Sequence, residues 1–138
     1  MKEMKRRRKP KGRIGKPNRR DLIKVADQLV SEIVRERDGN KCQRCGRPGN
    51  NAHHIFSRKY LNTRHALDNL ILLCFACHIH VAHGEPEKFR DFIIQRIGQS
   101  EFNRLKMSAY MTGSKVDMEM VIVGFERGNN MRLRALRK

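Results

Sequence analysis

The feature that most constrains this chain is a pair of Cys-x2-Cys motifs, which together contain all four cysteines of its 138 residues. Cys42 and Cys45 form the first pair, Cys74 and Cys77 form the second, and 28 residues separate the two pairs. Two such pairs can place four thiolates around one tetrahedral ion, and zinc is the usual ion there. Because four thiolates leave no open position, we expect a structural zinc; an iron–sulfur or redox role is the alternative.

Composition limits how the rest of the chain can fold. Hydrophobic residues make up 38% and charged residues 33%, so the length fits one domain with a small core plus tails. A structural metal would therefore supply a large share of the folding free energy. The sequence contains no apolar run long enough to cross a bilayer, and its basic start leads into no apolar signal segment. Cysteines that bind a metal indicate a reducing compartment.

The formal net charge of +17 points to a polyanionic partner, and nucleic acid is the commonest one. Residues 1–20 contain eleven Lys or Arg and a single acid. We expect residues 1–17 to be a disordered basic arm in which Arg6, Arg7 and Arg8 contact phosphates. A tail that only improves solubility is the alternative for this segment.

Periodicity predicts an α+β chain with a short hairpin. Polar residues 60–65 are predicted to be a loop, and residues 114–138 fit either a helix or a strand, with a basic end. We favour a helix there, because Met118, Val121, Ile122 and Phe125 suit one helical face. The remaining predicted elements are a helix from Asn18 or Asp21 to about Asp38, strands over 52–56 and 70–74, a helix from about Phe75 to His83, a helix from Pro86 to Gly98, and a helix capped by Ser100 that ends near Thr112.

Three histidines suggest chemistry beside the zinc. His53 and His54 are neighbours on a predicted strand, so they point to opposite faces and cannot share one role. One of them can bind a second metal ion, and the other can face an attacking water. His78, directly after the last cysteine, can complete that second site. Two imidazoles leave several coordination positions open, as a catalytic site requires.

Taken together, these motifs resemble a known family. Cys-x2-Cys, His53-His54-Ile55, Asp68-Asn69-Leu70 and Leu73-Cys74-x2-Cys77-His78 are similar to the zinc-bearing branch of the HNH endonucleases, as found in phages and prophages. The resemblance is dense from Cys42 to about His83 and looser as far as Leu105. It implies a ββα-metal core, stabilised by the four-cysteine zinc and surrounded by flanking helices.

The resemblance also implies roles for single residues. His54 would be the general base, His53 and His78 would hold the catalytic divalent ion, and Asn69 would tie down the loop that aims His54. With His53 where the family also allows a carboxylate, the ligands are nitrogens alone. Imidazole suits nickel and cobalt whereas magnesium prefers oxygen, so we expect Mn²⁺, Ni²⁺ or Co²⁺ to support activity at least as well as Mg²⁺.

Other polar residues have weaker support. Arg58, four residues after His54, would hold the scissile phosphate, and the alternative is a solvated loop arginine. We expect Lys59 and Arg64 to make general phosphate contacts. His65 is expected at the surface of the loop. On an α-helix His83 would lie roughly 140° around from His78, and His80 would point to yet another face. We therefore assign no role to His65, His80 or His83.

The sequence thus predicts a metal-dependent DNA endonuclease or nickase. Its nuclease domain would span residues 18–113, with an N-terminal bracing helix and C-terminal packing helices. We expect it in the cytoplasm of a bacterium or a phage-infected cell, without a membrane partner. It would be a monomer by default, although a homodimer is possible. The alternative is a noncatalytic nucleic-acid-binding zinc module, which explains the charge and cysteines but not the histidine spacing.

Overall fold

A computed structural model of the chain describes residues 15–112 and 115–136, and side chains as far as residue 128. The predicted phosphate contacts Arg6, Arg7 and Arg8, and the predicted boundary at 113–114, lie outside the described residues. In chain order the elements are α1 (Arg19–Arg37), β1 (Asn51–His54), α2 (Leu61–Arg64), the 3-10 turn η1 (Leu67–Asn69), β2 (Leu70–Leu73), the π-helix η2 (Cys77–His83), α3 (Pro86–Ile97), α4 (Gln99–Tyr110) and α5 (Met118–Leu136).

Helix α1 begins at a capping residue. The side chain of Asn18 accepts a hydrogen bond from the backbone N–H of Asp21 at 3.0 Å, and the Asp21 carboxylate suits the positive end of the helix dipole. Gly39 and Asn40 adopt φ angles of +64° and +56°, and this left-handed backbone ends the helix. The fully buried residues of the helix recur at helical spacing: Ala26, Val30, Ile33 and Val34.

The two strands form an antiparallel hairpin, as predicted. Asn51 lies opposite Leu73, and His54 lies opposite Leu70. Strand β1 ends at His54, two residues before the predicted end, because the chain bends away into the connection. The backbone N–H of Ile55 still donates to the carbonyl of Asn69, just before β2, at 2.8 Å. The hydrogen bonding between the two strands therefore extends one residue beyond β1.

The connection between the strands differs from the predicted polar loop. Residues 60–65 contain the single helical turn α2, and Thr63 and His65 in this segment are buried. The predicted surface position of His65 is therefore wrong. A segment this short carries no periodic signal. Its burial arises because α2 packs against α4 and because the His65 ring meets a side chain of α1.

Strand β2 is buried on both faces and separates two small cores. Leu70 and Leu72 pack with residues of α1, whereas Ile71 and Leu73 pack with residues of η2 and α3. Alternate residues of a strand point to opposite faces, so this unbroken apolar run serves both cores. The hairpin is thereby fixed between two sets of helices.

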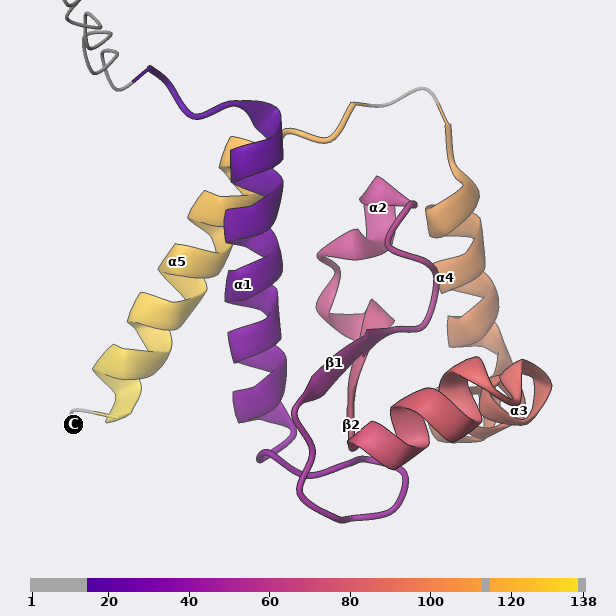
Figure 1. Ribbon diagram of the computed structural model, residues 1–138. Coiled ribbons are helices and arrows are strands. Elements are labelled where there is room, and N and C mark those ends of the chain that lie inside the picture. The colour runs from indigo at the N-terminus through magenta and orange to yellow at the C-terminus, as the bar shows by residue number, and fades with distance from the viewer. Residues whose placement is uncertain (1–14, 113–114, 137–138) are drawn as a thin grey trace, which may run out of the picture.

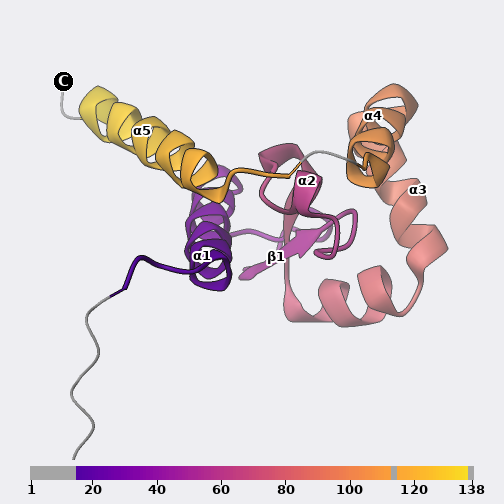
Figure 2. The ribbon, with the colours of Figure 1, turned by 90° about the horizontal axis from the view of Figure 1, so that it is seen from above.

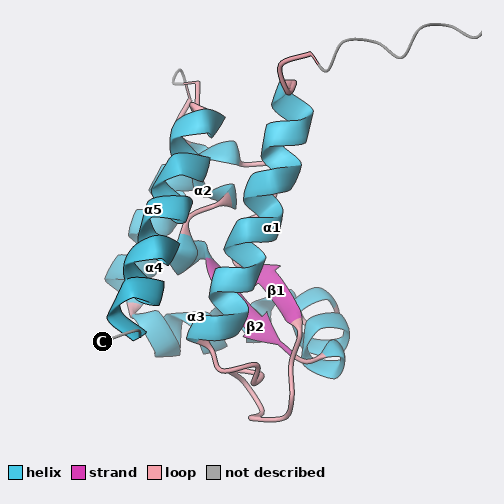
Figure 3. Cartoon of the chain, turned by 90° about the vertical axis from the view of Figure 1, so that its left-hand side faces the viewer, coloured by secondary structure: helices cyan, strands magenta, loops and turns pink. Residues whose placement is uncertain are grey.

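The helices stand on two sides of the hairpin. Helices α1 and α5 lie side by side on one flank, and α3 and α4 lie on the other (Figure 1). The view from above shows the hairpin between the two pairs (Figure 2). Figure 3 shows the C-terminal half of α1 beside both strands. The tail forms helix α5, and no helix among the described residues is long and apolar enough to span a membrane.

Helices α3 and α4 lie close to their predicted residue ranges, but the N-terminal cap of α4 differs from the prediction. Helix α3 begins at Pro86 and ends before Gly98, whose φ of +89° stops it. Helix α4 begins at Gln99, so Ser100 lies in its first turn and is not the N-cap. The short α2 and the π-helix η2 are the two departures that change the functional site.

The segment after the second cysteine pair is a π-helix over Cys77–His83, whereas the sequence predicted an α-helix from about Phe75 to His83. In a π-helix the hydrogen bonds run from i to i+5, so residues five apart lie on nearly the same face. The wide turn allows Cys77 to face the other cysteines while Val81 stays in the core. Gly84 follows it, and only glycine fits at this position, because a Cβ there would lie 2.5 Å from the backbone oxygen of His80.

The edge of β2 that faces away from β1 is also occupied. The Asp38 carboxylate accepts a hydrogen bond from the backbone N–H of Leu72 at 3.0 Å. The Arg37 guanidinium donates to the carbonyl of Leu70 at 2.6 Å, and the N–H of Gln43 donates to the carbonyl of Leu72 at 2.9 Å. The end of α1 and the first cysteine turn therefore hold the outer edge of the hairpin.

Candidate metal centres and active site

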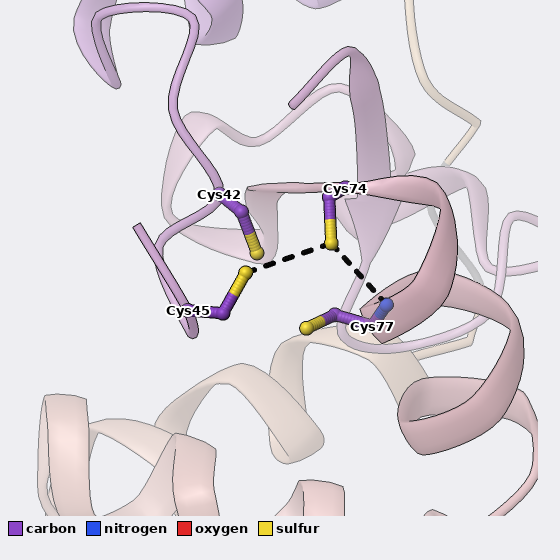
Figure 4. A group of neighbouring side chains, drawn as sticks. All are labelled: Cys42, Cys45, Cys74 and Cys77. Carbon is purple, nitrogen blue, oxygen red and sulfur yellow. Dashed lines mark hydrogen bonds between the residues drawn. The ribbon is translucent and has the colours of Figure 1, made fainter. Parts of the chain in front are cut away.

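The four cysteine sulfurs converge on one point (Figure 4). Cys42 and Cys45 come from the loop after α1, and Cys74 and Cys77 come from the end of β2 and the start of η2. All four sulfurs lie within 4.8 Å of one another, and those of Cys45 and Cys74 are 3.6 Å apart. In a tetrahedral zinc site with Zn–S bonds of about 2.3 Å, the sulfurs lie roughly 3.8 Å apart. The group fits a structural zinc ion.

Electrostatics also favours a cation among these sulfurs if all four are to be thiolates. Burial tends to raise the pKa of Cys42, but backbone N–H groups that donate to its sulfur lower it to about 6. Burial, together with the neighbouring sulfurs, raises the pKa of Cys77 to about 12 against the opposing effect of Arg44. The four thiols cannot all ionise side by side alone, whereas a bound dication removes that obstacle.

Tight turns bring the two cysteine pairs together. In the second pair the backbone N–H of Cys77 donates to the sulfur of Cys74 at 3.4 Å. In the first pair Gly46 takes a φ of +77° and its N–H donates to the carbonyl of Cys42 at 2.8 Å. A Cβ at Gly49 would lie 2.9 Å from the nitrogen of Cys42 and 3.1 Å from that of Cys74. Only glycine permits this approach of the two turns.

A second group of ligands consists of His53 on β1 with His78 and His83 on η2. Their ring nitrogens lie within 4.8 Å of one another. The Nε2 atoms of His78 and His83 are 3.1 Å apart, and the ring of His53 lies 5.2 Å and 5.3 Å from theirs, centre to centre. The ring of Phe89 packs against His53 at 5.0 Å. The π-helix is the reason that His83 joins this group.

The three imidazoles fit a divalent ion. Two nitrogens about 2.1 Å from one ion lie roughly 3.0–3.4 Å from each other, which matches the spacing of His78 and His83. Burial first, and then the neighbouring histidines, lower the pKa of His53 to about 3, and burial with His83 also lowers the pKa of His78. Neutral rings offer the lone pairs that a metal needs.

His54 points to the other face of β1. Its Nε2 lies 2.9 Å from the backbone oxygen of Arg64, and because a carbonyl only accepts, Nε2 carries the proton and Nδ1 is the basic nitrogen. Burial lowers the pKa of His54, and the charges of Arg58 and Arg64 lower it further, against the bond to that carbonyl and the charge of Asp27. The ring is therefore neutral near pH 7 and can accept a proton.

Asn69 is fully buried and spans the connection between the strands. Its Nδ2 donates to the backbone oxygens of Phe56 and Thr63, both at 3.1 Å. Its Oδ1 accepts from the N–H of Phe56 at 2.9 Å. The side chain thus fixes both ends of the segment that runs from β1 to α2, one residue before the carbonyl that holds His54.

One cavity of about 780 Å³ contains both kinds of histidine. His54 lines it together with the three histidines of the metal-ligand group. Arginines from three different parts of the chain lie around it: Arg35 of α1, Arg58 of the connection and Arg90 of α3. A site with basic and metal-binding groups and a positively charged lining suits an anionic substrate.

The predicted phosphate contacts have different surroundings. The side chain of Arg58 is 64% exposed and lies 3.8 Å from Asp27, so its guanidinium can reach a ligand. Lys59 lies over the ring of Tyr60, 4.9 Å from its centre. Arg64 departs from expectation, because its guanidinium is held by both oxygens of Asp27, at 2.8 Å and 2.6 Å. The charge of Arg64 is already paired within the protein.

Sequence reasoning missed three residues near the site. His83 was set aside because an α-helix would turn it away from His78, and the wider helix overturns that reason. His65 was expected at the surface, yet its Nε2 lies 2.8 Å from the carboxylate of Asp27. Asp27 itself sits on the polar side of an ordinary amphipathic helix, where no local pattern marks it.

A short hairpin followed by a helical segment, with ligands on both, is the ββα-metal fold that the sequence predicted. Residues 42–84 match the family model described as HNH endonuclease, so this part of the chain is similar to that family. The match covers about a third of the chain, and α1, α3, α4 and α5 lie outside it. No curated protein and no solved structure matches the chain.

Proposed function

We propose that this protein is a metal-dependent DNA endonuclease or nickase that hydrolyses phosphodiester bonds. One observation carries the proposal: His54 and the ligand group of His53, His78 and His83 line the same cavity. The HNH match over residues 42–84 supports the same reaction class. The DNA substrate is inferred from that match and from the net charge of +17.

The residues of the cavity would have different roles in hydrolysis. His54 would take the proton of the attacking water on Nδ1, while its Nε2 stays bonded to the Arg64 carbonyl. His53, His78 and His83 would hold a divalent ion, which would stabilise the negative charge that develops on the phosphate and the leaving oxygen. The closed four-cysteine zinc would take no part in the chemistry and would only hold the hairpin against η2.

Positive charge near the cavity would hold the DNA. Arg58 would contact the scissile phosphate, and Arg35 and Arg90 of the same cavity lining would be further backbone contacts. Lys59, next to Arg58 in the chain, would add another. Arg6, Arg7 and Arg8 would add contacts that carry no sequence information. Arg64 was a candidate for the same role, but its ion pair with Asp27 makes a positioning role the better proposal.

The donor set favours particular metals. Three imidazoles without a carboxylate form a nitrogen site, which suits nickel, cobalt and zinc better than magnesium. We therefore expect cleavage with Mn²⁺, Ni²⁺ or Co²⁺ at least equal to that with Mg²⁺. An assay in which magnesium alone supports cleavage would contradict this ligand set.

A plasmid assay tests the function. Supercoiled DNA is incubated with the parent chain and with His54→Ala, in the presence of Mn²⁺ or Ni²⁺. Loss of cleavage with retained DNA binding in His54→Ala would support the proposal. His80→Ala is the matched control, since His80 is exposed, lies on η2 and is absent from the ligand group. Nicked circles should precede linear DNA, because one site cuts one strand.

The competing function is a noncatalytic nucleic-acid-binding zinc module. It accounts for the charge and the four cysteines but gives no reason for four histidines grouped in one cavity lined with arginines. Tight DNA binding without cleavage in any divalent ion would favour it. Sedimentation of the DNA complex would show whether the protein acts as the monomer we expect or as a homodimer.

A further inference from the structure

A carboxylate near the middle of α1 collects three hydrogen bonds from the connection between the strands. Asp27 accepts from Nε and Nη2 of Arg64, at 2.8 Å and 2.6 Å, and from Nε2 of His65 at 2.8 Å. Its side chain is 26% exposed, so these bonds are shielded from competing water. A planar guanidinium held by both oxygens of a carboxylate has a fixed orientation.

Of the two partners of Asp27, Arg64 has one further hydrogen bond, from its Nη1 to the carbonyl of Arg58 at 3.4 Å. The ring of His65 is 4% exposed, and its Nδ1 has no hydrogen-bond partner among the described residues. Asp27 is therefore the polar group that fixes this ring. The two residues that it holds, Arg64 and His65, form the end of α2 and the residue after it.

The same backbone carries the acceptor for His54. The carbonyl of Arg64 takes the hydrogen bond from Nε2 of His54 at 2.9 Å. Asn69 holds the carbonyl of the preceding residue, Thr63, from inside the HNH segment. Asp27 holds Arg64 and His65 from outside it. The carbonyl that orients His54 is thus fixed on one side by Asn69 and on the other by α1.

We infer that Asp27 is a positioning residue for His54 and acts through the Arg64 carbonyl. This inference rests on the proposed nuclease function. It gives α1 a role beyond packing, because residue 27 lies outside residues 42–84, and it means that the HNH segment is incomplete without that helix.

The negative charge of Asp27 lies in a cavity lined with arginines, so its effect on DNA binding can be told apart from its effect on the reaction. Asp27 lines the cavity in which arginines would hold DNA, and it lies 3.8 Å from Arg58. A negative charge there repels phosphate, so its removal should leave DNA binding unchanged or tighter. If Asp27 positions His54, its removal should nevertheless slow the reaction. Turnover should therefore fall without any loss of DNA binding.

Kinetics of the full, zinc-loaded chain on plasmid DNA tests this. Asp27→Asn keeps the size but places an N–H₂ donor where an oxygen faces Arg64 or His65. We expect kcat to fall about 10- to 100-fold, as for other residues that orient a reacting group, with KM unchanged or lower. Glu32→Gln removes the same charge from an exposed part of α1 and should cleave like the parent.

A double-mutant cycle separates positioning from a general structural effect. In a His54→Ala background, Asp27→Asn should change the residual rate by less than about twofold, because the ring that it positions is gone. Asp27→Glu retains the charge and moves the carboxylate by one methylene. It should lower kcat in the parent at an unchanged melting temperature, and it decides the case if Asp27→Asn does not fold.

The outcomes are distinct. Equal losses in both backgrounds, or full activity of Asp27→Asn and Asp27→Glu, would overturn the positioning role while the nuclease function stands. A parent that cleaves under no divalent ion would overturn both. Long-range ¹H–¹⁵N NMR adds a readout without turnover: His54 should carry its proton on Nε2 in the parent and show a mixture of tautomers in Asp27→Asn. A single Nε2–H form in both would contradict the inference.

Discussion

The Nε2 atoms of His78 and His83 lie 3.1 Å apart, although the two residues are five positions apart on one helix. An α-helix would turn the second ring roughly 140° away from the first, and a π-helix brings it back. The local helix type therefore decides whether the second metal site has two nitrogen ligands or three. Gly84, directly after the π-helix, leaves room for the backbone oxygen of His80, which a Cβ at this position would meet.

His83→Ala should weaken the second metal site without disturbing the zinc. Residues that only support a ligand already change metal affinity by about 10- to 100-fold, so loss of a direct ligand should reduce Ni²⁺ or Co²⁺ affinity at least about tenfold. Isothermal titration of the zinc-loaded chain measures this. His80→Ala should bind like the parent, and equal affinity in His83→Ala would remove His83 from the ligand set.

The four-cysteine site should hold about one zinc ion per chain, and the fold should depend on it. A structural zinc contributes about 10–16 kcal/mol of apparent binding free energy, which is comparable with the whole stability of a small domain, about 5–15 kcal/mol. Cys45→Ser, at the exposed cysteine, should lose zinc and its cooperative thermal transition. Metal analysis and circular dichroism measure both. A zinc-free variant with the parent's melting curve would show that the ion is dispensable.

Gly49→Ala should separate the two cysteine turns. The added methyl group would press on the backbone of Cys42 and Cys74, which cannot move without displacing the zinc ligands. We expect a loss of about 1–3 kcal/mol in the free energy of unfolding in urea. The control is Gly124→Ala in α5, where a Cβ would meet nothing within 4 Å. That change should be neutral or stabilising by up to about 1 kcal/mol, since alanine favours helices.

His65 should make stability depend on pH. Burial lowers its pKa against the hydrogen bond and charge of Asp27, so the folded state binds the proton less well than the unfolded chain, whose value is near 6.5. The stabilising contribution of His65 to the free energy of unfolding is complete above about pH 6.5. It is lost as the pH falls through the pKa of His65 in the folded state. The free energy of unfolding of the zinc-saturated chain should therefore decrease between about pH 7.5 and pH 5.5.

His65→Gln isolates this contribution. Glutamine can still donate an N–H to Asp27 but does not titrate, so its stability should fall less over the same pH range. Any release of zinc in acid affects the parent and the variant alike and disappears in their difference. Parallel pH profiles for the two proteins would show that His65 is not the titrating group.

The sequence predicted the parts of the site that depend on local spacing. The two cysteine pairs and the alternation of His53 and His54 follow from motif and strand geometry, and the match and the fold confirm the HNH resemblance and the ββα-metal class. The choice between α- and π-helix over Cys77–His83 has no such signal in the sequence. The contact of Asp27 with His65 joins residues 38 positions apart, which no local pattern encodes.

Arg37, Asp38 and Gln43 already use the outward backbone groups of β2 at Leu70 and Leu72. A strand from another molecule could extend the hairpin on that side only by breaking these bonds, so edge-to-edge growth into larger sheets or fibres is blocked there. On the opposite side, β1 carries His53 and His54, which line the cavity. The hairpin is thereby protected from strand addition at its β2 edge, while the candidate active-site histidines of β1 stay on the open side.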